Sequence, residues 1–171
     1  TYFEGPRWHT RTIMEDVSPT HLALDITPEG LEWGLMRTAN GALHQVNFSG
    51  AYWTDYLLEA GPVGENFELQ IDADGVAHVL YTKPATGEVV LLRIDGTDHD
   101  RRLLLQDDDL ADVLGMDLDA NNIEQVATAT QADESFSINL IRSLAGQHTG
   151  RGNPVPPTAL EGEAADDEGL M

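Results

Sequence analysis

Two pairs of aspartates are spaced as potential ligands for a calcium ion. Asp72 and Asp74, and again Asp117 and Asp119, alternate with apolar residues, which is how a calcium loop presents carboxylate oxygens. A complete loop needs about five spaced oxygens and a bidentate acid at its end, and the Asp-Ala-Asp-Gly run at 72–75 stops short of that. Aspartates in such runs more often accept hydrogen bonds from their own turn. We therefore expect turn stabilisation, with calcium as the alternative and no other cofactor.

No motif of a known catalytic chemistry accompanies these acids. The six histidines never stand at a spacing such as His-x-x-x-His, so no zinc site is predicted. The chain has no cysteine, and hence no thiolate nucleophile, disulfide or Cys-ligated metal. It also lacks a Gly-x-Ser-x-Gly elbow and a glycine-rich phosphate loop. We therefore assign no catalytic residue and no metal ligand.

The charge composition narrows the classes of partner. The 171 residues carry 30 acidic and nine basic side chains, a formal net charge of −21, and Lys83 is the only lysine. Clustered Lys and Arg recognise nucleic acids and anionic membranes, so neither is an expected partner. No apolar run approaches the ~20 residues of a membrane span, and no signal peptide opens the chain. Because the chain starts at Thr1 rather than Met, export after N-terminal processing stays open, and so does the compartment.

The elements that would position these residues repeat along the chain. Residues 40–50 align without a gap with residues 86–96, so that Gly41 falls on Gly87. Residues 30–36 fall on 75–81, and a third, weaker copy includes Met116. The copies cover about 6–50, 51–96 and 97–146. A repeat of this length predicts one supersecondary unit per copy.

Each copy predicts short strands joined by glycine-containing turns. In the second copy the strands are expected at 67–72, 76–81, 88–94 and 101–106. Asp-Gly and Asn-Gly suit the hairpins between strands because glycine adopts positive φ freely. Residues 108–114 differ, since acids precede apolar residues there and one or two helical turns are expected. The side chains expected to be buried between repeats are Leu22, Leu24, Leu69, Ile71 and Leu118.

Four antiparallel strands per repeat of about 45 to 50 residues are typical of β-propeller blades. The run Phe-Glu-Leu-Gln-Ile-Asp-Ala-Asp-Gly-Val-Ala-His-Val-Leu-Tyr at 67–81, followed by Gly-Glu-Val-Val-Leu-Leu-Arg at 87–93, resembles repeats of bacterial sialidase-like (BNR-type) β-propellers. The resemblance covers roughly residues 8–146 and implies an all-β propeller of about three four-stranded antiparallel blades. No copy has the Ser-x-Asp-x-Gly-x-x-Trp Asp box, and the family's arginine triad and Tyr-Glu pair find no counterparts. The resemblance therefore implies the fold and no activity.

Three blades are fewer than the four to eight of a complete ring, so closure needs further strands. The segment 8–15 resembles the fourth-strand segment 53–59, whereas the third copy ends without a fourth strand. We expect the N-terminal strand to complete a blade, because this removes exposed sheet edges. A homodimer, or blades supplied by another chain, would complete the ring.

A candidate ligand site follows from this architecture. Trp33 and His78 hold equivalent positions near the start of a second strand, where propeller residues approach the central channel. We favour packing of these side chains in the core. The alternative is a ligand site in the channel that Trp33 and His78 form together with Gln125.

The tail at 147–171 has a different composition. It is rich in Pro and Gly and strongly acidic, and such a segment cannot bury enough apolar surface to offset its ordering entropy. We expect it to be extended, and to bind a surface of this chain or of a partner through Leu160, Leu170 and Met171. The alternative is an ordinary flexible linker.

Two classes of function stay open. The lack of catalytic motifs and the acidic tail favour a non-catalytic interaction or scaffold module, an accessory subunit of a larger assembly. The alternative is a carbohydrate-binding or carbohydrate-active propeller, lectin or glycosidase-like, which stacks aromatic residues on sugar rings. Two carboxylates within ~10 Å of each other beside an exposed aromatic residue would favour that alternative.

Overall fold

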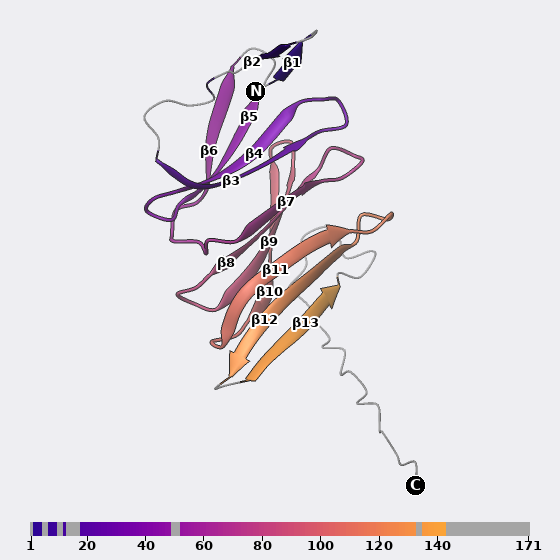
Figure 1. The fold of residues 1–171 in the computed structure, drawn as a ribbon. Coiled ribbons are helices and arrows are strands. Elements are labelled where there is room, and N and C mark those ends of the chain that lie inside the picture. The colour runs from indigo at the N-terminus through magenta and orange to yellow at the C-terminus, as the bar shows by residue number, and fades with distance from the viewer. Residues whose placement is uncertain are drawn as a thin grey trace.

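The computed structural model describes residues 2–4, 7–9, 12, 18–48, 52–132 and 135–142. These residues form strands, turns and loops, arranged as one hairpin and three antiparallel sheets (Figure 1). This part of the chain contains no helix long and apolar enough to cross a membrane. The predicted all-β class is therefore confirmed, whereas the tail anchors Leu160, Leu170 and Met171 lie outside the described residues.

The sheets follow one another along the chain, and each is a meander in which consecutive strands pair. Sheet 1 comprises β3 (Pro19–Ile26), β4 (Glu32–Thr38), β5 (Leu43–Phe48) and β6 (Trp53–Glu59). Sheet 2 comprises β7 (Phe67–Ile71), β8 (Ala77–Lys83), β9 (Glu88–Asp95) and β10 (Asp98–Gln106). Sheet 3 comprises β11 (Leu110–Leu118), β12 (Glu124–Ala132) and β13 (Ser135–Arg142). The separate hairpin pairs β1 (Tyr2–Glu4) with β2 (Arg7–His9).

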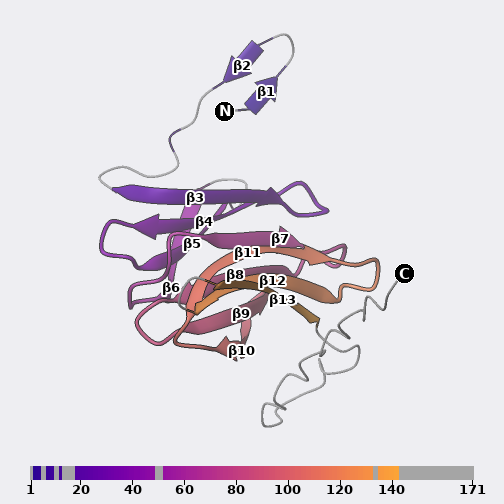
Figure 2. The same ribbon diagram turned by 60° about the horizontal axis from the view of Figure 1, so that its bottom comes forward.

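The three sheets are stacked face to face, with sheet 2 between sheets 1 and 3 (Figures 1 and 2). One apolar core lies between sheets 1 and 2 and includes Leu35 and Val79. A second core lies between sheets 2 and 3 and includes Leu80 and Val126. Because side chains alternate along a strand, β8 supplies Val79 to one core and Leu80 to the other. The first strands β3 and β7 are neighbours, as are β7 and β11.

The turn between the first two strands has the same backbone in all three sheets. Its first residue accepts a hydrogen bond from the N–H three positions on and donates to the carbonyl four positions on. The residue three positions on has positive φ, a conformation open to glycine and tolerated by asparagine. The first residues are Thr27, Asp72 and Asp119, and the positive-φ residues are Gly30 at 83°, Gly75 at 81° and Asn122 at 58°.

The aspartates at the first position of this turn bind their own backbone. Asp72 Oδ1 accepts the N–H groups two and four positions on, both at 2.9 Å, and Asp119 Oδ1 does the same at 2.8 and 3.1 Å. The N–H of Asn121, followed by that of Ile123, holds the pKa of Asp119 below its ordinary value. The expected turn stabilisation is thus confirmed for both acids. Among the described residues no group of His, Asp and Glu is arranged to hold a metal ion.

In sheets 1 and 2, the turn between the second and third strands accepts a hydrogen bond from the linker that follows the fourth strand. Val63 N donates to Gly41 O, and Asp107 N donates to Gly87 O, both at 2.9 Å. Both glycines have positive φ, and a Cβ would stand 2.8 Å from Pro62 Cα at position 41 and 2.1 Å from Asp107 O at position 87. The glycines aligned in the sequence therefore occupy equivalent turns.

The segment 108–114 is not helical, and that expectation was wrong. β11 begins at Leu110 and pairs with β12 along its length. Leu110 and Met116 of this strand pack against the core between sheets 2 and 3. A helix of one or two turns has little stability of its own, so pairing and burial in the sheet decide the conformation.

The burial expected for the first strands is wrong for β3. Leu22 and Leu24 are 67% and 61% exposed. Leu69 and Ile71 of β7 are half-buried against the first core, and Leu118 of β11 is half-buried. The difference arises because no described sheet precedes sheet 1 in the stack.

The N-terminal strand also differs from the expectation. Within the described residues, Trp8 and His9 of β2 pair with Phe3 and Tyr2 of β1, and not with sheet 3. Most of the remaining predicted strand, up to residue 15, lies outside the described residues. Sheet 3 has three described strands, so β13 forms its edge.

Replacing Gly87 by Ala should destabilise the protein more than replacing Gly75 by Ala. At Gly75 the positive φ alone opposes a side chain, because a Cβ there meets nothing closer than Glu29 Oε2 at 3.7 Å, and the expected loss is about 1 to 2 kcal/mol. At Gly87 the collision with Asp107 O adds to this strain and displaces the linker. Urea unfolding measures both losses, and equal losses would contradict the close contact of turn and linker.

Candidate functional site

Trp33, His78 and Gln125 occupy equivalent positions, each three residues after the positive-φ residue of the first turn. Trp33 is buried in the core between sheets 1 and 2. His78 is fully buried and bonds to Glu124 of sheet 3. Gln125 follows Glu124 in β12 and is half-buried, so it faces the opposite side of sheet 3. The structure places the three side chains in successive layers, and their common ligand site stays a prediction.

His78 is the centre of a buried polar cluster between sheets 2 and 3. Its Nδ1 lies 3.0 Å from Glu124 Oε1, and its Nε2 lies 3.2 Å from Asp72 Oδ2. The side chains of His78, Glu124 and Asp72 are 0%, 2% and 3% exposed. Each ring nitrogen therefore faces a buried carboxylate oxygen, one from each of two sheets.

This cluster joins sheet 2 to sheet 3. Both ring nitrogens of His78 are engaged by carboxylates, which leaves neither available as a base or a metal ligand. Asp72 belongs to the first turn of sheet 2, and Glu124 opens β12 of sheet 3. The cluster thus joins the first turn of one sheet to the second strand of the next.

Replacing His78 by Leu should destabilise the protein strongly, because it removes the ring to which the buried carboxylates of Asp72 and Glu124 both bond. Breaking a buried pair in this way costs about 3 to 5 kcal/mol. His44→Leu is the matched control, since His44 Nδ1 lies 2.8 Å from an Asp55 oxygen but the Asp55 side chain is 38% exposed. The control should lose about 1 kcal/mol or less. Similar losses for both variants in urea unfolding would contradict the fastening role.

A second polar cluster joins β6 of sheet 1 to sheet 2. Glu59 Oε2 accepts a hydrogen bond from Tyr81 Oη at 3.3 Å and lies 3.6 Å from Lys83 Nζ and 3.7 Å from Arg101 Nη2. Glu88 Oε2 lies 3.9 Å from the same Lys83 nitrogen and 3.7 Å from the same Arg101 nitrogen. Arg101 Nε also donates to Tyr81 Oη at 3.3 Å. The two carboxylates therefore share two cations.

Two neighbouring carboxylates are also what a glycosidase requires. Its general acid needs apolar surroundings that keep it protonated, whereas Glu59 and Glu88 face Lys83 and Arg101. The aromatic side chain beside them, Tyr81, is 1% exposed and offers no face to a sugar. This arrangement suits a charge-neutralised joint between sheets better than an acid–base pair.

Burial raises the pKa of Tyr81 above its ordinary value of 10.0, although the hydrogen bond from Arg101 opposes the shift. The folded phenol thus keeps its proton to higher pH than the unfolded one. Stability from this group is present below about pH 10 and is lost as the pH rises through the folded pKa.

Tyr81→Phe should therefore lose stability less steeply than the wild type in alkaline solution. Urea unfolding between about pH 9 and 11 measures the slope, and tyrosinate absorbance measures the titration. The difference between wild-type and Tyr81→Phe absorbance should titrate above pH 10, whereas a difference centred below pH 10 would contradict the raised pKa.

One hydrogen bond between a side chain and a backbone group joins the first strands at each junction. Asp25 Oδ2 accepts the N–H of Ile71 at 2.9 Å, and Gln70 Nε2 donates to the carbonyl of Met116 at 2.7 Å. Asp25 and Gln70 are equivalent, because each stands two residues before the first turn residue of its sheet. Asp117 holds this position in sheet 3. Its exposed carboxylate accepts, among the described residues, only the N–H of the next residue at 2.9 Å.

Sheet 1 exposes a row of apolar side chains on β3, at one end of the stack. Leu22, Leu24 and Ile26 are 67%, 61% and 58% exposed. Counted from the first turn, their equivalents in sheet 2 pack against the core shared with sheet 1. These equivalents are Phe67, Leu69 and Ile71. The positions that are exposed on sheet 1 are thus the same positions through which sheet 2 packs on sheet 1.

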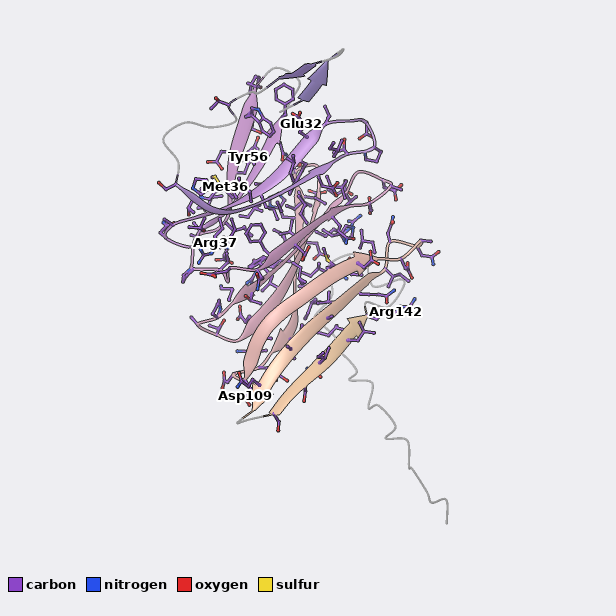
Figure 3. The ribbon with its side chains drawn as sticks, in the orientation of Figure 1. Glu32, Met36, Arg37, Tyr56, Asp109 and Arg142 are labelled. Atoms are coloured by element: carbon purple, nitrogen blue, oxygen red, sulfur yellow. The ribbon has the colours of Figure 1, made fainter. Side chains whose placement is uncertain are left out.

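Sheet 3 exposes apolar side chains on β13, at the other end of the stack. Ile138 and Leu140 are 74% and 61% exposed. The registers of β8 with β9 and of β12 with β13 make Val89 and Leu91 their equivalents, and both are buried against sheet 3. Figure 3 shows this sheet at the end of the stack, with Arg142 at one end of β13.

Sequence reasoning named His78 and Asp72 for other roles, and it missed their partner Glu124. Glu124 stands 46 positions after His78, and the same separation relates Asp25 to Ile71. The repeat length therefore contained the signal, because residues one repeat apart meet at each junction. Glu59 and Arg101 carry no such signal, since only the packing of β6 against sheet 2 brings them together.

No protein-family model and no curated protein matches the chain. The resemblance to sialidase-like repeats accordingly rests on the residues quoted for it.

Proposed function

We propose that the chain is a non-catalytic interaction module made of three consecutive blades of a β-propeller that resembles the sialidase-like type. Meandering sheets, equivalent first turns and neighbouring first strands support this architecture. In a propeller, such first strands surround the central axis and the blades pack face to face. Its role would be that of an accessory subunit that joins further β-sheets in a larger assembly.

The two open end faces carry the proposal. Ile26 and Leu24 on sheet 1, and Ile138 and Leu140 on sheet 3, are exposed at positions whose equivalents are packed inside the stack. Exposed rows of large apolar side chains mark interaction surfaces in soluble proteins. A partner that supplies a sheet to either face would bury them.

The carbohydrate-active alternative has less support. Trp33 and Tyr81 are buried, so neither is placed to stack on a sugar. The carboxylates of Glu59 and Glu88 are shared by two cations. We therefore retain the interaction module as the proposed function.

Native mass spectrometry of the protein isolated from its source tests the proposed function. The wild type should be found in an assembly heavier than the 18.7 kDa chain, and Leu24→Lys should release it, because a charge on an apolar interface is costly to bury. Leu103→Lys is the matched control, since Leu103 is 44% exposed on β10 of the middle sheet. A wild-type chain isolated as a free monomer would refute the module.

A further inference from the structure

We infer that the partner of each open face is the opposite open face of a second copy of this chain. The inference rests on the proposed function and names its partner. Sheet 3 of one copy would pack on sheet 1 of the other, as sheet 2 packs on sheet 1 and sheet 3 on sheet 2 within the chain.

The two open faces are of complementary kinds. We call the face of a sheet that packs on the next sheet along the chain its leading face, and the face that packs on the preceding sheet its trailing face. Each of the two internal junctions joins the leading face of one sheet to the trailing face of the next. The free face of sheet 3 is a leading face, because Ile138 and Leu140 are equivalent to Val89 and Leu91. The free face of sheet 1 is a trailing face, because Leu24 is equivalent to Leu69. A second copy therefore offers each face the type of surface that it meets inside the chain.

Asp117 supplies the polar part of the same junction. Asp25 accepts the N–H of its own next residue at 2.8 Å with Oδ1 and uses Oδ2 for the N–H of Ile71 in the next sheet. Asp117 has the first of these bonds, at 2.9 Å. Because Asp117 holds in β11 the position that Asp25 holds in β3, its carboxylate would bond to the first strand of a sheet packed on sheet 3. In the second copy that strand is β3, where Ile26 is the equivalent of Ile71.

The number of sheets favours two copies. A contact between different faces is heterologous, so it either closes into a ring or grows into a filament. The described residues of one chain form three stacked sheets beside the β1–β2 hairpin, fewer than the four to eight blades of closed propellers, whereas two chains would supply six and three chains nine. A ring of two chains therefore fits, and it buries both open faces of each copy.

Net charge acts against this association. Each copy carries a formal charge of −21, and like-charged molecules repel over distances that salt screens. The faces themselves are apolar along β3 and β13. Dimerisation should consequently strengthen as the salt concentration rises, which is opposite to the behaviour of an interface held by ion pairs.

Sedimentation of the purified full chain tests the inference at low and high salt. The expected mass is twice 18.7 kDa, and Leu24→Lys and Leu140→Lys should each reduce it to that of the monomer, because they alter the two sides of one junction. Leu103→Lys adds the same charge away from both faces and should leave the dimer intact. A monomeric wild type, a dimer lost in only one of the two face variants, or a series of larger polymers would overturn the closed pair.

A disulfide cross-link tests the direction of the contact, because the chain has no cysteine of its own. A mixture of Asp117→Cys and Ile26→Cys chains should form a disulfide-linked dimer that neither variant forms alone. Asp25→Cys combined with Ile71→Cys in one chain is the control, because it repeats the internal junction. If the disulfide forms in the control chain but no cross-link forms in the mixture, the head-to-tail arrangement is overturned.

The outcomes separate this inference from the proposed function. A purified chain that stays monomeric, while the protein from its source is bound to a different protein, overturns the pairing of two copies and leaves the interaction module standing. A monomer in both preparations overturns both.

Discussion

Face-to-face packing of thin apolar sheets is the interaction on which the rest of this structure depends. A single sheet has two faces, and in sheet 2 both are apolar, with Val79 on one and Leu80 on the other. Neither face has enough partners within its own sheet, so each must be covered by a neighbour. The stack is therefore held by contacts between neighbouring layers, which is the behaviour of repeat proteins whose stability is a sum of units and interfaces.

Polar side chains at the junctions fix how one sheet lies on the next. Apolar packing alone is non-directional, whereas the hydrogen bonds between Asp25 and Ile71 and between Gln70 and Met116 each relate one side chain to one backbone group. The cluster around His78 adds a buried polar contact in which both ring nitrogens are bonded only when Asp72 and Glu124 are both in place. These bonds specify the register of the layers.

A stack in which every sheet packs on two neighbours leaves one apolar face exposed at each of its ends. The same residue positions that bind a neighbour inside the stack are left in water at its two ends, as Leu24 and Leu140 show. Closing a ring removes both ends, which is the physical advantage of propellers and of closed oligomers. The proposed function and the proposed pairing of copies both derive from this requirement, and neither needs a catalytic group.

The amino-acid sequence by itself determined the strands, their order and the repeated turns, because these depend on local alternation and on glycines such as Gly41 and Gly87. The helical turns predicted for residues 108–114 were wrong, because pairing with β12 prevails there over the local preference. Tertiary structure alone decided which side chains meet between layers, as with His78 and Glu124, and which remain exposed, as with Leu22. The physical reason is that burial depends on whether a neighbouring sheet is present, and a strand with the same pattern is covered inside the stack and exposed at its end.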